Sequence, residues 1–105
     1  MYHVYLLKSK KKDIFYIGYA KDIYKRIDEH NAGKSEYTKK YAPWILVYYE
    51  SFIALEDAKR REKSLKSFGK AYAQLKMRIR DSLNNTSVFM NIKGAKQIEG
   101  AGCEL

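Results

Sequence analysis

The chain of 105 residues has room for one domain with one small hydrophobic core. Its hydrophobic fraction of 46% argues against a disordered protein, and no apolar run approaches the roughly 20 residues that cross a bilayer. Lysine and arginine number 21 against 12 acidic residues, a net charge of +9. Such a charge on a small domain favours a polyanionic partner, most often nucleic acid. The alternative is a basic surface without a specific partner, as on ribosome-associated proteins.

The two ends of the chain differ in character. Residues 84–105 carry two lysines and two glutamates, so the basic excess lies in residues 1–83. The tail lacks periodicity and contains three glycines, so we expect a loosely held extension in which residues 88–92 could dock as a short strand. The start lacks the residue order of a signal peptide, and the single cysteine, Cys103, can form no internal disulfide. We therefore expect a cytoplasmic protein.

Two β-branched and aromatic runs open the chain, at residues 2–8 and 14–19. The polar residues 9–13 between them predict a turn, so the two runs should pair as an antiparallel hairpin. Gly18 near the end of the second run indicates a place where the backbone bends or is closely approached.

A helix is predicted over residues 23–31. Asp22 can cap it by accepting hydrogen bonds from its first N–H groups, and Gly33 is a reasonable stop. Ile23 and Ile27 form the apolar stripe that would face the core.

Three further elements follow a polar, basic loop at residues 32–43. Residues 44–52 are the strongest strand, and their continuous apolar character favours the central position of the sheet. Helices are predicted over residues 54–67 and 71–83, separated by Gly69. This order predicts an α+β domain, in which helices pack on a small three-stranded antiparallel sheet.

Several side chains of this domain could take part in chemistry on a phosphodiester. Tyr5 and Tyr16 lie on adjoining strands of the hairpin, and on one face their hydroxyls could converge on one water or phosphate oxygen. Either tyrosine alone is more often structural, because aromatic residues fill small sheets.

Arg26 and His30 lie four residues apart, at the edge of the buried stripe of the first helix. Arg26 offers a fork of donors suited to phosphate oxygens, while His30 could bind a phosphate or relay a proton. The structural alternatives are an ion pair of Arg26 with Asp22 or Glu29 and a His30 that caps the helix end.

Glu62 shares the inward face of the second helix with Leu55, Ala58 and Leu65. A carboxylate there could hold a hard divalent cation, with water and substrate oxygens completing the shell. Its structural alternative is an intrahelical ion pair with Lys59 or Lys66.

The order Val4-Tyr5, Tyr16-Ile17-Gly18, Arg26, His30 and Glu62 resembles the GIY-YIG nuclease family over residues 1–83. The segment 44–50 and the following Arg60-Arg61-Glu62-Lys63 helix resemble its small single-domain members, which are related to the N-terminal domain of the excision-repair nuclease C subunit. The first motif, His3-Val4-Tyr5, lacks the family's Gly and Ile. The asparagine that many members place after the metal glutamate has no convincing counterpart either.

The resemblance implies hydrolysis of a phosphodiester with one divalent metal, Mg²⁺ or Mn²⁺, leaving 5′-phosphate and 3′-hydroxyl ends. It assigns the general base and a substrate-orienting hydroxyl to Tyr5 and Tyr16, without deciding which is which. It also implies that Arg26 stabilises charge on the phosphate, that His30 assists there, and that Glu62 binds the metal.

The leading hypothesis is a metal-dependent DNA endonuclease in repair or processing, selective for structure rather than sequence, with no membrane and no obligate protein partner. The alternatives are a nucleic-acid-binding module with little or no catalysis and a basic accessory protein. The lysines expected to contact phosphates are Lys34, Lys39, Lys40, Lys59, Lys63 and Lys66.

Overall fold

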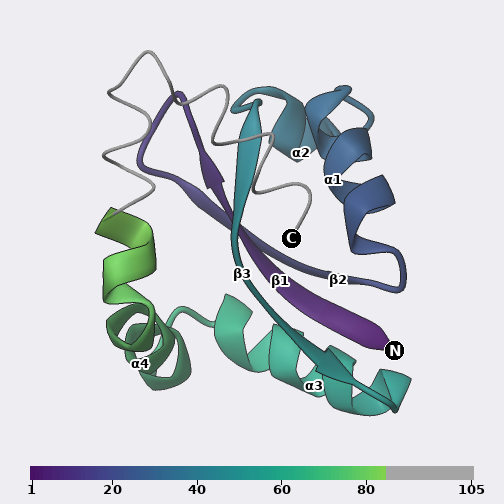
Figure 1. Ribbon diagram of the computed structural model, residues 1–105, viewed down its shortest axis with the longest axis vertical. Coiled ribbons are helices and arrows are strands. Elements are labelled where there is room, and N and C mark those ends of the chain that lie inside the picture. The colour runs from purple at the N-terminus through teal and green to yellow at the C-terminus, as the bar shows by residue number, and fades with distance from the viewer. Residues whose placement is uncertain (85–105) are drawn as a thin grey trace.

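The computed structural model describes residues 1–84, which form a three-stranded sheet with helices on both faces (Figure 1). The elements in chain order are β1 (Tyr2–Ser9), β2 (Phe15–Ala20), α1 (Ile23–Asn31), α2 (Glu36–Lys39), β3 (Trp44–Phe52), α3 (Leu55–Lys66) and α4 (Lys70–Arg78). The predicted α+β class and the antiparallel hairpin are confirmed. The expected tail and its short strand at residues 88–92 lie outside the described residues.

The strand order of the sheet is β2-β1-β3, with both neighbours antiparallel to β1. The prediction that residues 44–52 form the central strand is therefore wrong. Residues from Val4 onward are buried on both faces of β1, whereas Tyr49 in β3 is exposed. The apolar and aromatic residues of β3 would suit a central strand. However, β3 lies at an edge of the sheet, where most of its side chains are only partly buried.

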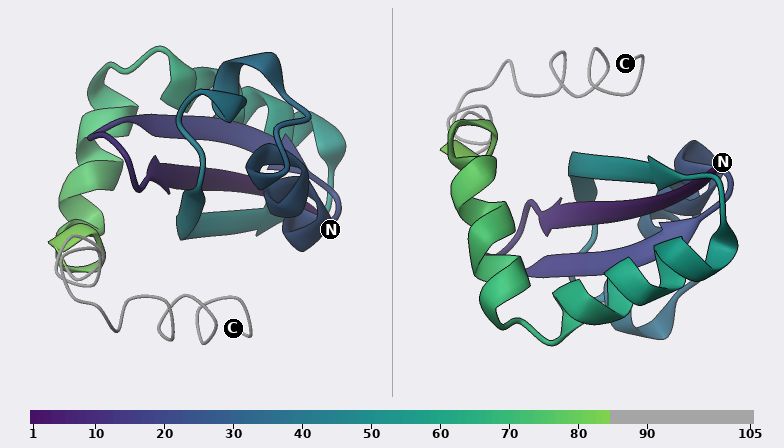
Figure 2. Two further views of the ribbon diagram at one scale, coloured as in Figure 1. Left: turned by 90° about the horizontal axis from the view of Figure 1, so that it is seen from above. Right: turned by 90° about the horizontal axis from the view of Figure 1, so that it is seen from below.

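Each face of the sheet has its own hydrophobic core. Val4 and Leu6 of β1 pack on one face with Leu65 of α3 and Leu75 of α4. On the opposite face, Tyr5 and Leu7 of β1 pack with Ile23 of α1 and with Trp44. Seen from above, α1 and α2 lie in front of the sheet, and seen from below, α3 lies in front of it (Figure 2). The alternation of side chains along β1 thus divides its residues between two layers.

The helices agree with the local signals in the sequence at the start of α1 and differ from them at α2 and at Ile79. Asp22 caps α1, because its side chain accepts a hydrogen bond from the Lys25 N–H at 3.1 Å. The loop predicted at residues 32–43 contains the short helix α2. The last helix is interrupted by a turn at Ile79, and helical structure resumes over residues 80–84. No helix among residues 1–84 is long and apolar enough to cross a membrane.

Candidate active site

The β1–β2 hairpin brings Tyr5 and Tyr16 to one face of the sheet. Tyr5 lies opposite Gly18, and Leu7 lies opposite Tyr16, so the two tyrosines are diagonal neighbours with ring centroids 6.4 Å apart. Gly18 is closely approached, as predicted: a methyl group on it would come within 2.5 Å of the Tyr5 hydroxyl oxygen. Glycine is needed at this position because the phenol of Tyr5 lies across its backbone.

His30 connects this face of the sheet to α1 and α2. Its side chain is fully buried, at 0% exposure, and its Nε2 lies 3.0 Å from the Tyr5 hydroxyl. The other ring nitrogen, Nδ1, lies 2.8 Å from the hydroxyl of Thr38, which is also buried. His30 is therefore not the solvent-facing helix cap that its position near the end of α1 could suggest.

The hydrogen bonds around His30 favour one tautomer. The Thr38 hydroxyl donates to the Ser35 carbonyl oxygen at 3.5 Å, so its oxygen is left to accept the Nδ1 proton of His30. We assign the remaining lone pair, on Nε2, as acceptor for the Tyr5 O–H. Burial, and then the positive charge of Arg26, lower the pKa of His30 to about 4, so the imidazole is neutral near pH 7.

Tyr5 is also held in its neutral form. Burial, and then the neighbouring Tyr16, raise the pKa of Tyr5 to about 12. Arg26 opposes this rise through a hydrogen bond and through its charge. The Tyr5 hydroxyl is thus bonded to the His30 imidazole and affected by the Arg26 guanidinium, and 1% of the residue is exposed.

Arg26 forms the ion pair with Glu29 that was its structural alternative, at 3.0 Å. The hydrogen bond to Glu29 is the main cause that raises the pKa of Arg26, and the same bond lowers the pKa of Glu29. Arg26 is nevertheless more than an exposed helix arginine, because its guanidinium also acts on Tyr5.

Glu62, on α3, lies near the side chains of Tyr5 and Tyr16. Its side chain is 18% exposed and pairs with Lys66 at 3.2 Å, as the structural alternative allowed. The Glu62 carboxylate also raises the pKa of Tyr5, and the Lys66 ammonium lies 5.7 Å from the ring centre of Tyr16. Side chains from opposite faces of the sheet can meet here because β2 is an edge strand.

All five predicted side chains therefore gather around the Tyr5 hydroxyl and the Tyr16 ring. We name this group the hairpin–helix cluster; its members are Tyr5, Tyr16, Arg26, His30 and Glu62. The family model of the GIY-YIG catalytic domain matches residues 1–80 of the chain.

The chain belongs to the GIY-YIG family. This confirms the family resemblance in the sequence, and GIY-YIG nucleases act on nucleic acid and generally use divalent metals.

Two curated relatives and one solved structure are similar in sequence to this chain. A "UPF0213 protein" of Staphylococcus haemolyticus is 42% identical over 70 residues, which cover 66% of this chain and 84% of that protein. A "UPF0213 protein" of Halobacterium salinarum is 38% identical over 72 residues, covering 68% and 92%. A solution NMR structure of a UPF0213 protein from Bacillus halodurans is 31% identical, with a TM-score of 0.46, and the match covers 75% of this chain and 85% of that one.

The hairpin–helix cluster of this GIY-YIG domain contains one carboxylate, that of Glu62, which could bind a divalent cation. No group of three or more His, Cys, Asp or Glu side chains suited to a metal gathers within residues 1–84. Glu62 is the one carboxylate among the members of the hairpin–helix cluster, and it pairs with the ammonium of Lys66. A hard cation at Glu62 would thus take its remaining ligands from water and phosphate oxygens, the usual pattern for Mg²⁺.

The six lysines expected to contact phosphates are all exposed and fall into two groups. Lys34, Lys39 and Lys40 lie on and beside α2, while Lys59, Lys63 and Lys66 lie on α3 along the edge that carries Glu62. A hollow of about 300 Å³ lies on the other edge of α3, lined by Phe52, Asp57, Arg60, Arg61 and Ser64. It contains no member of the hairpin–helix cluster.

Two residues of this site were not found by sequence reasoning. Thr38 and Tyr37 lie in the segment predicted to be a loop, and neither belongs to a motif. Thr38 orients His30, and the Tyr37 ring lies 6.0 Å from that of Tyr16. Only the folding of α2 against α1 brings them to the cluster.

Proposed function

We propose that this protein is an endonuclease that hydrolyses DNA phosphodiester bonds with one divalent cation, Mg²⁺ or Mn²⁺, in DNA repair or processing. Its selectivity would be for structure rather than sequence. The observation that supports this proposal is the convergence of the hairpin–helix cluster in a domain of the GIY-YIG family. The domain occupies residues 1–83.

In this mechanism Tyr5 and His30 act together on the attacking water. The Tyr5 oxygen accepts a proton from water while its own proton passes to Nε2 of His30. Tyr5 then remains neutral overall, which suits a hydroxyl whose pKa is about 12. Since the charge of Arg26 lowers the pKa of His30, a bound phosphate that neutralises Arg26 makes His30 a better acceptor.

The other members of the cluster would hold the phosphate. Arg26 donates to its oxygens and stabilises the negative charge that develops in the transition state. Tyr16 lies half-exposed beside Tyr5 and orients the substrate through its hydroxyl. When bound at Glu62, a divalent cation supplies Lewis-acid stabilisation of that same charge.

A panel of nicked, branched and single-stranded DNA, with RNA counterparts, tests this proposal in Mg²⁺ and in Mn²⁺. We expect cleavage by the wild-type chain and its loss in Glu62→Gln and Arg26→Ala. The matched controls are Glu56→Gln and Arg60→Ala, because both side chains are exposed on α3. Absence of cleavage by the wild type, or equal loss in the controls, would contradict the proposal.

A second candidate function is nucleic-acid binding without cleavage. It is favoured by the burial of Tyr5 at 1% exposure and by the ammonium of Lys66 on the Glu62 carboxylate. It predicts salt-sensitive binding that needs no metal and that survives Glu62→Gln, with no product on any substrate of the panel.

A further inference from the structure

Tyr37 is an exposed aromatic ring at the rim of the hairpin–helix cluster. It is 57% exposed, and its ring centroid lies 6.0 Å from that of Tyr16, at an interplanar angle of 35°. The ring centroid of Tyr41 also lies 6.0 Å from that of Tyr37, and it lies 6.5 Å from that of the buried Trp44. A row of aromatic rings thus leads from the core to the surface next to the cluster.

The backbone that carries Tyr37 is held by two hydrogen bonds of the next residue. The neighbouring Thr38 is tied to His30 through its hydroxyl, and its carbonyl accepts the indole N–H of Trp44 at 2.8 Å. A ring presented by such a fixed segment loses little further freedom when a ligand packs on it. Tyr24, by contrast, is 41% exposed on α1 and makes no ring contact with any residue of 1–84.

Exposed lysines lie near Tyr37 in the chain and beside its neighbour Tyr16. Lys34, Lys39 and Lys40 are exposed on the same segment, and Lys66 lies over the Tyr16 ring. Exposed aromatic rings combined with lysines along a backbone path are the composition of surfaces that bind single-stranded nucleic acid. Such a ring can receive a base only when that base is not stacked in a duplex.

We propose that Tyr37 stacks on an unpaired base next to the phosphate held by the cluster, and so selects nucleic acid with unpaired nucleotides. Single strands, flaps, gaps and forks belong to this substrate class, whereas intact duplex does not. The inference rests on the proposed nuclease function for the cut itself, but base stacking by Tyr37 can be measured without it.

The experiment uses the full chain in EDTA and oligonucleotides with 2-aminopurine at successive positions, single-stranded or in a duplex. We expect the wild type to quench the fluorescence of one position of the single strand. Tyr37→Ala should weaken single-strand binding by about 5- to 150-fold, the range for losing one base–aromatic stack, and should abolish the quenching. Tyr37→Phe and the control Tyr24→Ala should keep both.

A second variant separates stacking from packing. Tyr37→Leu retains an apolar side chain beside Tyr16 but has no aromatic face, so it should bind like Tyr37→Ala. Wild-type affinity and quenching in both Tyr37→Ala and Tyr37→Leu would overturn the inference. So would equal loss of binding to single strand and duplex, because a stack acts only on unpaired bases.

Cleavage assays distinguish this inference from the function on which it rests. Quenching that depends on Tyr37, with no cleavage in Mg²⁺ or Mn²⁺, would support the stacking site and refute the nuclease proposal. Cleavage of intact duplex and single strand at equal rates, unchanged in Tyr37→Ala, would support the nuclease and overturn the role of Tyr37.

Discussion

Substitution of Gly18 by alanine tests the geometry at the centre of the cluster. A methyl group at this position would lie 2.5 Å from the Tyr5 hydroxyl oxygen, 2.7 Å from its Cζ and 3.1 Å from Cε2 of Tyr16. Contacts under 3 Å require one partner to move. Tyr5 cannot swing into solvent, because it is buried under α1 and bonded to His30.

The expected loss of stability has two sources. Overpacking of a well-filled site costs about 1–3 kcal/mol, and a displaced Tyr5 leaves His30 without its partner at about 1–3 kcal/mol. We expect Gly18→Ala to lower the free energy of unfolding by at least about 2 kcal/mol. For a domain of this size that corresponds to a fall in Tm of about 8–16 °C.

Urea and thermal unfolding, followed by circular dichroism, measure this loss. Gly69→Ala is the matched control, since a methyl group there meets Ser67 Oγ at an ordinary 3.6 Å. Because Gly69 is the N-cap of α4, alanine there should cost only about 0.5–1 kcal/mol. If Gly18→Ala were as stable as the control, with unchanged near-ultraviolet signals from its tyrosines, the Tyr5 ring would not lie across this backbone.

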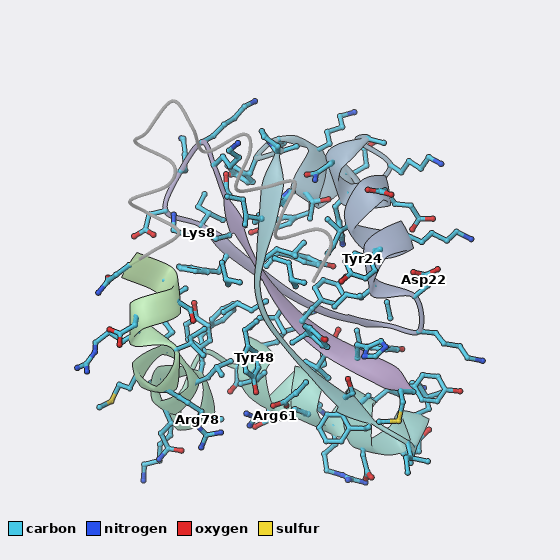
Figure 3. The ribbon with its side chains drawn as sticks, in the orientation of Figure 1. Lys8, Asp22, Tyr24, Tyr48, Arg61 and Arg78 are labelled. Carbon is cyan, nitrogen blue, oxygen red and sulfur yellow. The ribbon has the colours of Figure 1, made fainter. Side chains whose placement is uncertain are left out.

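Two further predictions concern pH and the placement of α3. Since the pKa of His30 is lowered to about 4 in the folded protein, the unfolded chain binds more protons between pH 6.5 and 4. Stability should therefore fall on acidification, by up to about 3 kcal/mol from this group, and the loss should shrink in His30→Gln; an NMR titration midpoint near 6.5 for His30 would contradict its burial. Arg61 of α3 binds the Glu50 carboxylate of β3 at 2.5 Å, and the Tyr48 hydroxyl donates to the same carboxylate. Figure 3 shows the side chains of Tyr48 and Arg61 close together. Arg61→Met should cost about 1–3 kcal/mol by removing the cationic partner of Glu50, whereas the added Glu50→Gln should recover part of it in a double-mutant cycle; additive effects would show that the pair does not join α3 to β3.

Local signals predicted most of the elements because short stretches decide them. The cap at Asp22, the turn at residues 9–13 and the apolar stripe of α1 depend on hydrogen bonds and periodicities within a few residues. The family motifs also follow chain order, so the members of the hairpin–helix cluster could be named before their positions were known.

The position of each strand required the complete fold. The long aromatic run of residues 44–52 predicted a central strand, yet β1 is central because both of its faces are covered. Hydrophobicity along one strand does not reveal which strands lie beside it. That choice depends on how helices from distant parts of the chain cover the two faces.

The sequence by itself determined the α+β class, the antiparallel hairpin and the residue types available for phosphodiester chemistry. Only the tertiary structure decided that His30 bonds to Tyr5 and Thr38, that Lys66 pairs with Glu62 beside Tyr16, and that Tyr37 stands at the rim. The physical reason is range: capping, turns and amphipathic stripes arise between near neighbours, while the site forms where elements remote in the chain pack around the open edge of β2.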